Sequence, residues 1–217
     1  MAWISWGGRI GVLLVVAGMA SAAELTAQET PGPTVRVRMR DYVGLSQPTL
    51  ARAKLTASYV LRQAGVLLEW AECRIHQNDP PKDPACELAV TPMDLQLQLI
   101  DATMARHTGK TGQCLGYAVV TGSFDSIASV FAHRALELEK RNFADRAAIL
   151  GAIMAHEIGH LLLGQSRHSA SGIMRAKWGD ENLKLIAKGR MWFTEEEASR
   201  LVCNVAKRRQ AQHVHVW

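Results

Sequence analysis

The sequence predicts an α+β fold in which a twisted sheet, mostly antiparallel or mixed, packs on one central apolar helix. Segments with apolar residues at every second position occupy the first part of the chain, which is the pattern of half-buried strands. After residue 142, the sequence FADRAAILGAIMAHEIGHLLLG is apolar on nearly all sides, which indicates a helix buried against that sheet. A small C-terminal part that ends in another helix completes the predicted fold.

The chain begins with a stretch that is typical of an export signal. Arg9 precedes an apolar run from Ile10 to Ala20, and small residues suited to signal peptidase follow at Ala20 and Ala22. This run is much shorter than the roughly 20 residues that span a bilayer. We therefore predict a signal peptide over residues 1–22, a linker over 23–33 and one domain over 34–217, located in the periplasm or secreted.

The predicted strands and the first helix follow in a simple order. TVRVRMRDYV alternates Val35, Val37 and Met39 with basic residues and is expected to be a strand. Pro48 opens a helix, TLARAKLTASYVLRQAG, that ends at Gly65. Further strands are expected at VLLEWAEC, DLQLQLI, LGYAVV and SIASVFAHRAL.

Capping residues set the limits of the later helices. Asn142 can cap the start of the central helix, and Gly164 can end it. The segment from Gly164 to about Met191 is expected to be irregular. Thr194 and Glu197 then form a capping box for the last helix.

Charge and cysteine content narrow the class of protein. The net charge is +5, and the basic residues are scattered apart from Lys207-Arg208-Arg209, which fits a solvated helix end better than a nucleic-acid footprint. Four cysteines in an exported chain favour disulfides. Cys73 and Cys86 flank a polar, proline-containing loop and are expected to pair, whereas the pairing of Cys114 with Cys203 stays open.

The central helix carries the residues that point to chemistry, in the sequence HEIGH. His156 and His160 lie about 40° apart on the helix, with Glu157 within the same 100° arc. Two imidazoles one turn apart can bind one zinc ion, and the carboxylate beside them can take a proton from zinc-bound water. Without such partners, the buried groups would cost several kcal/mol, so we favour a zinc site over a satisfied polar cluster.

These residues resemble the signature of the metzincin zinc peptidases, H-E-x-x-H-x-x-G-x-x-H. This chain has His156, Glu157 and His160, followed by Gly164 and His168. The glycine and the third histidine come one and two residues later than in the family. The resemblance implies that His168 is the third zinc ligand and that the return loop after Gly164 is correspondingly longer.

The resemblance also implies two supporting elements. Met174, in the sequence SGIM, is similar to the methionine of the turn beneath the metal, which would form an apolar floor for the histidines. SIASVFAHRAL resembles the edge strand that pairs with an extended substrate in this family. The tyrosine that some members carry after the methionine is absent here.

Three alternatives stay open at the level of sequence. Cys114 precedes the motif at a distance similar to that of the metal-binding cysteine of peptide deformylases, which are metal amidases. Glu181 is the nearest downstream carboxylate for a gluzincin-like site. A non-catalytic secreted binding module with a structural zinc is the third, although such a site would need a fourth protein ligand.

The sequence is thus interpreted as an exported zinc-dependent endopeptidase. His156, His160 and His168 are expected to bind Zn²⁺, Glu157 to act as general base towards a metal-activated water, and Met174 and Gly164 to support the site. The expected partner is a peptide or protein substrate. We expect no nucleic acid, no membrane span after signal cleavage, and a monomer.

Overall fold

The computed structural model describes residue 1 and residues 32–76, 78–80, 82–110, 112, 114–121 and 126–214. The expected signal peptide (1–22) and linker (23–33) lie outside the described residues, apart from residues 1, 32 and 33. The compact unit runs from Pro31 to Trp217.

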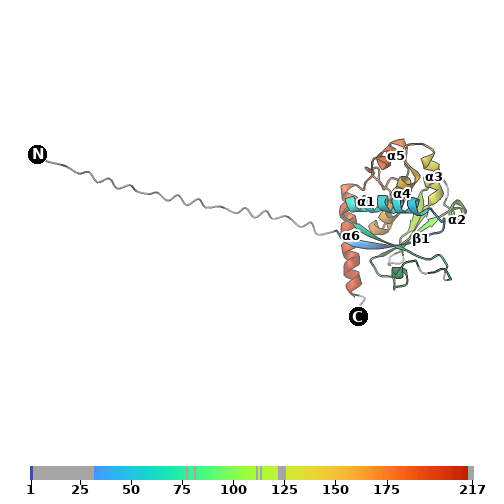
Figure 1. Ribbon diagram of the computed structural model, residues 1–217, viewed down its shortest axis with the longest axis horizontal. Coiled ribbons are helices and arrows are strands. Elements are labelled where there is room, and N and C mark those ends of the chain that lie inside the picture. The colour runs from blue at the N-terminus through green and yellow to red at the C-terminus, as the bar shows by residue number, and fades with distance from the viewer. Residues whose placement is uncertain are drawn as a thin grey trace. The chain divides into compact units, whose positions relative to one another are not determined.

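A five-stranded mixed sheet forms one layer of this unit (Figure 1). Its strands lie in the order β2-β1-β3-β5-β4, with β4 as the antiparallel partner of β5 and all other neighbours parallel. The mixed sheet is as expected, but most of its pairing is parallel. Alternation along a strand shows which face is buried and does not show the direction of the neighbouring strand. The strands are β1 Thr34–Asp41, β2 Leu67–Glu72, β3 Asp94–Ile100, β4 Gly116–Val119 and β5 Ile127–Phe131.

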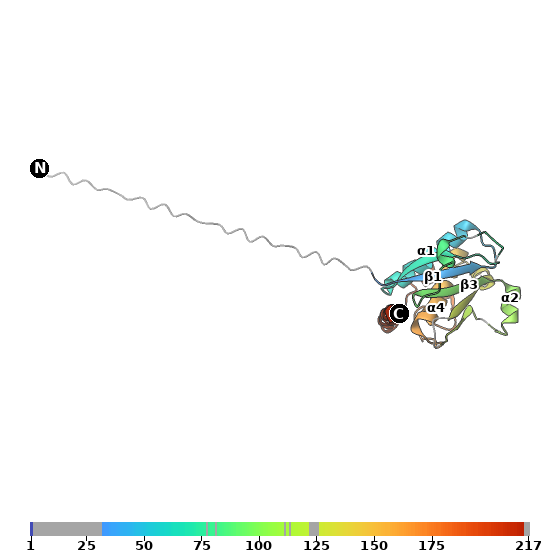
Figure 2. The ribbon, with the colours of Figure 1, turned by 90° about the horizontal axis from the view of Figure 1, so that it is seen from below.

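In the described part of the chain, six α-helices and one short 3₁₀ helix accompany the sheet. Helices α1 and α4 lie on the same side of it, and α6 runs past its end (Figures 1 and 2). The helices are α1 Gln47–Gln63, η1 Pro84–Cys86, α2 Ala102–His107, α3 Ala132–Glu139, α4 Arg146–Leu163, α5 Asp180–Ala187 and α6 Glu195–Val214.

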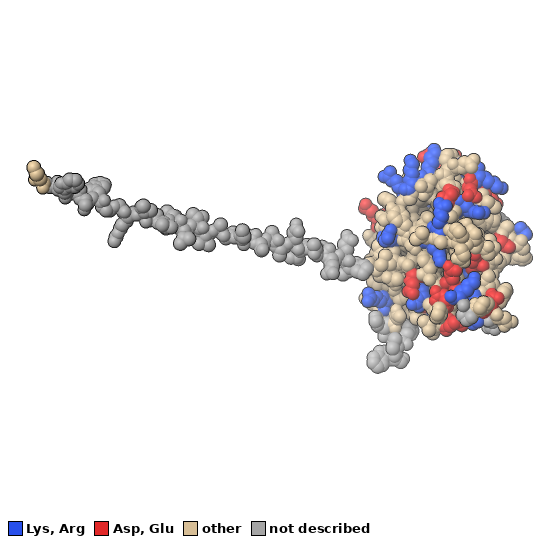
Figure 3. Space-filling view, in the orientation of Figure 1, with Lys and Arg blue, Asp and Glu red and all other residues tan. Residues whose placement is uncertain are grey.

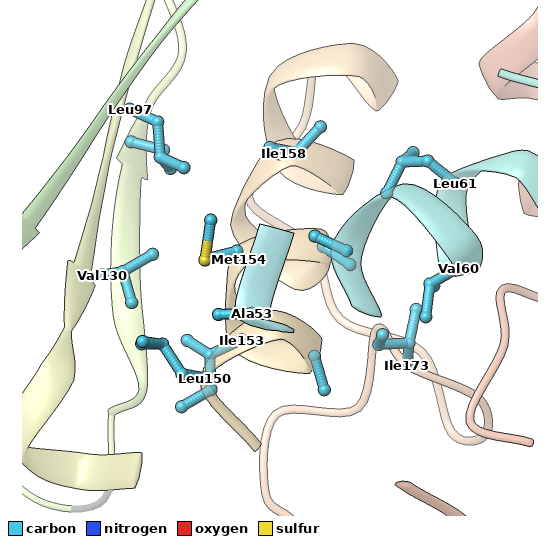
Figure 4. Close-up of a cluster of buried hydrophobic side chains, with 14 of the residues drawn as sticks. Ala53, Val60, Leu61, Leu97, Val130, Leu150, Ile153, Met154, Ile158 and Ile173 are labelled. Carbon is cyan, nitrogen blue, oxygen red and sulfur yellow. The ribbon is translucent and has the colours of Figure 1, made fainter. Parts of the chain in front are cut away.

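The core is built around α4, which lies between the sheet and α1 (Figure 4). Leu97 of β3 and Val130 of β5 face Met154 and Ile158 of α4, and all four are fully buried. By length and composition α4 could cross a membrane, yet 89% of it is buried inside the protein. Such burial is typical of the core helix of a soluble protein, which agrees with its expected central role.

Close contact between α1 and α4 depends on Gly151. A Cβ atom at this position would lie 2.4 Å from the carbonyl oxygen of Ala53 and 2.6 Å from the Cβ of Thr56, both on α1. Glycine therefore allows the two helix backbones to approach.

The structure corrects three local expectations near α4. SIASVFAHRAL is a strand only over Ile127–Phe131, after which α3 begins, and this strand lies inside the sheet because β4 forms the edge. Asp145, and not Asn142, caps α4 by accepting hydrogen bonds from the N–H groups of Ala147 and Ala148. The expected irregular segment contains α5.

Other expectations about helix ends and cysteines are confirmed. Gly164 ends α4 in the left-handed conformation, with φ of 65°. Thr194 and Glu197 form the capping box of α6, because each backbone N–H donates to the other residue's side chain. Cys73 and Cys86 form a disulfide, whereas Cys114 and Cys203 are not bonded to each other.

The substitution Gly151→Ala tests the contact between α1 and α4. Alanine is the better helix former by about 1 kcal/mol, but its Cβ would collide with the backbone of α1. We expect a net loss of about 1–3 kcal/mol in the free energy of unfolding, which is typical of overpacking. Urea denaturation measures this loss. A stabilised Gly151→Ala variant would contradict this account.

Candidate metal centre

The C-terminal half of α4 places His156, Glu157 and His160 inside the protein. These residues expose only 3%, 2% and 4% of their surfaces. Helical periodicity directs both imidazoles to the same side, and their Nε2 atoms lie 3.1 Å apart. The sequence expectation that the three groups share one face of a helix is therefore met.

His168 returns to the two helical histidines despite its later position in the chain. Its ring centroid lies 5.3 Å from that of His156 and 4.9 Å from that of His160. One ligand nitrogen from each of the three rings lies within 4.8 Å of the others. The three histidines thus form a cluster that could hold a metal ion. In the described part of the chain, no further histidine, cysteine, aspartate or glutamate joins this group.

Backbone carbonyls determine which nitrogen of each helical histidine carries the proton. The Nδ1 atom of His156 lies 2.7 Å from the carbonyl oxygen of Ile173, and the Nδ1 atom of His160 lies 2.8 Å from that of Gln165. A carbonyl can only accept, so both Nδ1 atoms must donate. In the neutral rings, the Nε2 atoms then carry lone pairs, which is the form that binds a metal.

The facing lone pairs favour a cation between them. Two Nε2 atoms that both lack a proton cannot form a hydrogen bond with each other, so their separation of 3.1 Å is repulsive when the site is empty. Protonation does not relieve the repulsion, because burial, followed by the neighbouring His160, lowers the pKa of His156 to about 3. Two nitrogens bound at about 2.0–2.1 Å to one tetrahedral zinc are roughly 3.3 Å apart. The residues present therefore fit a bound metal ion, and imidazole ligands suit zinc, copper, iron or nickel.

The turn that contains Met174 lies directly against α4. A Cβ atom at Gly159 would come within 2.7 Å of the Met174 sulfur, so the lack of a side chain there lets the buried methionine reach α4. The preceding residue, Ile173, provides the carbonyl that holds His156 and also donates its N–H to Trp192. The turn thus positions His156 through the backbone of Ile173 and packs against α4 through the side chain of Met174.

Glu157 is buried beside the histidines and lacks a partner for one of its oxygens. Its Oε2 atom has no hydrogen-bond partner, and desolvation raises the pKa of the carboxyl to about 8. A Cβ at Gly116 would lie 2.7 Å from Oε1, so the carboxyl packs against the backbone of β4. A cation at the histidines would favour the ionised form.

An open cleft of about 560 Å³ gives access to the cluster. On one side it is lined by Leu115 and by the β4 residues Gly116, Tyr117 and Ala118. The other lining residues include His156, Glu157 and His160 of α4 and His168 of the loop after it. The remaining lining residues include Cys114, Ser166, Ala176 and two lysines, Lys110 and Lys177. Elsewhere, basic and acidic side chains are interspersed over the face shown in Figure 3.

Two contributions to the site were not found in the sequence. Gly116 allows β4 to approach Glu157, although a lone glycine in a short strand gives no such signal. Trp178, four residues after Met174, is buried and lies edge-on to His156 with ring centroids 5.9 Å apart. Its short spacing from the methionine was the only available signal.

The alternative third ligands lie outside the cluster. Cys114 lines the cleft but is not among the residues at ligand distance. Glu181 lies on α5, where its carboxylate accepts a hydrogen bond of 2.6 Å from Lys184. No protein-family model matches this chain, and comparison with curated proteins finds no match.

Substitution separates the three candidate ligands. His168→Ala should weaken zinc binding strongly because it removes one of the three clustered nitrogens, whereas Cys114→Ser and Glu181→Ala should keep one zinc per chain. Metal analysis after dialysis against a weak chelator makes the measurement. Stoichiometric zinc in His168→Ala, together with its loss in Cys114→Ser, would favour the deformylase-like site.

The metal-free protein should be destabilised by acid through its buried histidines. Unfolded histidine takes up a proton near pH 6.5, whereas folded His156 resists protonation down to about pH 3. Its contribution is therefore present above pH 6.5 and is lost as the pH falls from 6.5 towards 3. Glu157, with its raised pKa, has the opposite effect. Its contribution to stability is complete below about pH 4.5 and is lost as the pH rises towards 8.

Urea unfolding of the metal-free wild type and of His156→Gln, each from pH 7 to pH 4, isolates the contribution of His156 to the free energy of unfolding. The wild type should lose stability relative to the variant as the pH falls. A constant difference would contradict the assigned neutral state of His156.

Proposed function

We propose that this chain is an exported, metzincin-like zinc-dependent endopeptidase. The proposal is carried by one observation: the three clustered histidines and Glu157, whose Oε2 atom has no hydrogen-bond partner, line the same open cleft. A purely structural metal site would use a fourth protein ligand. Among the described residues, no fourth candidate ligand lies within the cluster.

In this proposal the three histidines bind the metal and Glu157 transfers the proton. A zinc ion held by the three histidines would supply an acidified water, with a pKa near 7, and a Lewis acid for the substrate carbonyl. Glu157 takes the proton from the attacking water and delivers it to the leaving amine. Burial of Glu157 keeps the competing bulk water away from this carboxyl, and Gly116 leaves the space that the carboxyl occupies.

The exposed edge of β4 supports a peptide substrate. Among the described strands, β4 pairs with β5 alone, so its other edge can offer N–H and C=O groups to an extended chain. Residues of β4 line the cleft next to Glu157. A peptide added along β4 would therefore bring its backbone past the carboxyl and the histidines. This role belongs to β4 and replaces the one expected of SIASVFAHRAL.

The disulfide supports an exported location. The Cys73–Cys86 bond fits an oxidising compartment. It agrees with the apolar start of the sequence, from which we infer a cleaved signal peptide.

Glu157→Gln tests the catalytic assignment. The amide keeps the shape of the side chain but cannot accept the proton, so we expect at least a 10²-fold loss of peptide hydrolysis, with zinc still bound. Cleavage of casein and of a fluorogenic peptide library provides the assay, and Glu181→Gln on the surface of α5 is the matched control. Wild-type cleavage by Glu157→Gln would refute the proposed hydrolase.

A further inference from the structure

One face of α6 carries four polar side chains directed at the end of α4 and the loop after it. Glu197, Arg200, Asn204 and Arg208 are spaced by three or four residues and so lie along one side of the helix. We call them the α6 stripe. Each makes a hydrogen bond to α4 or to the loop that carries His168.

Glu197, the first member of the α6 stripe, binds Ser169, which is the neighbour of His168 in the chain. Glu197 is only 4% exposed, and its Oε1 atom accepts a hydrogen bond from the hydroxyl of Ser169. Its Oε2 atom accepts from the N–H of Thr194 at 2.9 Å, so the carboxylate is fixed at the start of α6. Ser169 follows His168 directly in the chain. Glu197 therefore ties the exposed ligand to a capped helix end.

The second member acts on the residue that orients His160. The Arg200 guanidinium donates to the side-chain oxygen of Gln165 at 2.8 Å. The backbone carbonyl of this same Gln165 accepts from Nδ1 of His160. Arg200 thus holds the residue that sets the proton position of the second ligand.

The last two members bind the final turn of α4. The Asn204 amide donates to the carbonyl of Leu162 at 3.0 Å, and Arg208 donates to that of Leu161 at 3.1 Å. Carbonyls in the last turn of a helix have no partner within the helix. These bonds fix the position of α6 along α4, so that Glu197 and Arg200 reach the return loop.

We propose that the α6 stripe is the positioning device for two of the three metal ligands, His160 and His168. His156 is held separately, by the carbonyl of Ile173. No member of the stripe belongs to the histidine cluster, so Glu197 and Arg200 act as positioning residues through Ser169 and Gln165. The inference rests on the metal site of the proposed function and is independent of hydrolysis.

The longer spacing between His160 and His168 explains why the return loop needs these anchors. Four loop residues, from Gly164 to Arg167, connect the end of α4 to His168, and His168 itself is exposed. Its freedom would reduce metal affinity, because ordering the loop on binding costs conformational entropy. Anchors at Gln165 and Ser169 limit that freedom on both sides of the ligand.

Zinc affinity, measured by chelator competition without any peptide, tests the proposal. Ser169→Ala and Arg200→Met remove the two anchors, and we expect each to weaken zinc binding about 10–100-fold, the usual effect of losing an outer partner of a ligand. Arg209→Met, an exposed arginine on the same helix, is the matched control and should bind as the wild type does. Glu197→Gln, which keeps an oxygen that can accept from Ser169, should lose less affinity than Glu197→Ala.

The absorption spectrum of the cobalt-substituted protein gives a second readout. Displaced ligands should change the intensity of the visible bands in Ser169→Ala and Arg200→Met, but not in Arg209→Met. Variants that lose thermal stability yet keep wild-type zinc affinity and cobalt spectra would overturn the proposal and leave α6 a merely structural helix. A wild-type chain that bound no zinc would refute the metal site itself, whereas zinc binding without peptide cleavage would refute the peptidase alone.

Discussion

Two neutral imidazoles whose unprotonated nitrogens face each other at 3.1 Å repel unless a cation lies between them. This arrangement persists because each opposite nitrogen donates to a fixed carbonyl, one from Ile173 and one from Gln165. Both carbonyls lie in loops, so the loops must be held as firmly as the helix. The break at Gly164, the turn at Met174 and the anchoring by α6 all serve that requirement. The buried core supplies the low dielectric that keeps the histidines neutral.

Local periodicity accounts for what the sequence could predict of this site. The helix places His156 and His160 on one side whatever surrounds it, and Gly164 marks the end of that helix wherever it packs. The approach of His168 followed from the family resemblance and not from spacing, because a return loop has no period. The disulfide was predictable because its two cysteines flank one short polar loop.

Contacts between distant segments account for what the sequence could not predict. Strand alternation identifies the buried face of β5 but not its neighbours, so its interior place in the sheet and the edge position of β4 were missed. Asn142 and Asp145 are both good capping residues, and only the folded chain shows that Asp145 is used. The capping box of Glu197 was visible in sequence, but its second bond, to Ser169, joins residues 28 apart.

The order of elements along the chain has a consequence for how the protein forms as it is synthesised. By length and composition the apolar helix α4 could enter a bilayer if it were left unpacked. Its docking surfaces on α1 and on the sheet precede it in the chain, so they are already present when α4 emerges. The loop with His168 and then α6 emerge last. The apolar helix can therefore be sheltered before His168 joins His156 and His160 in their cluster.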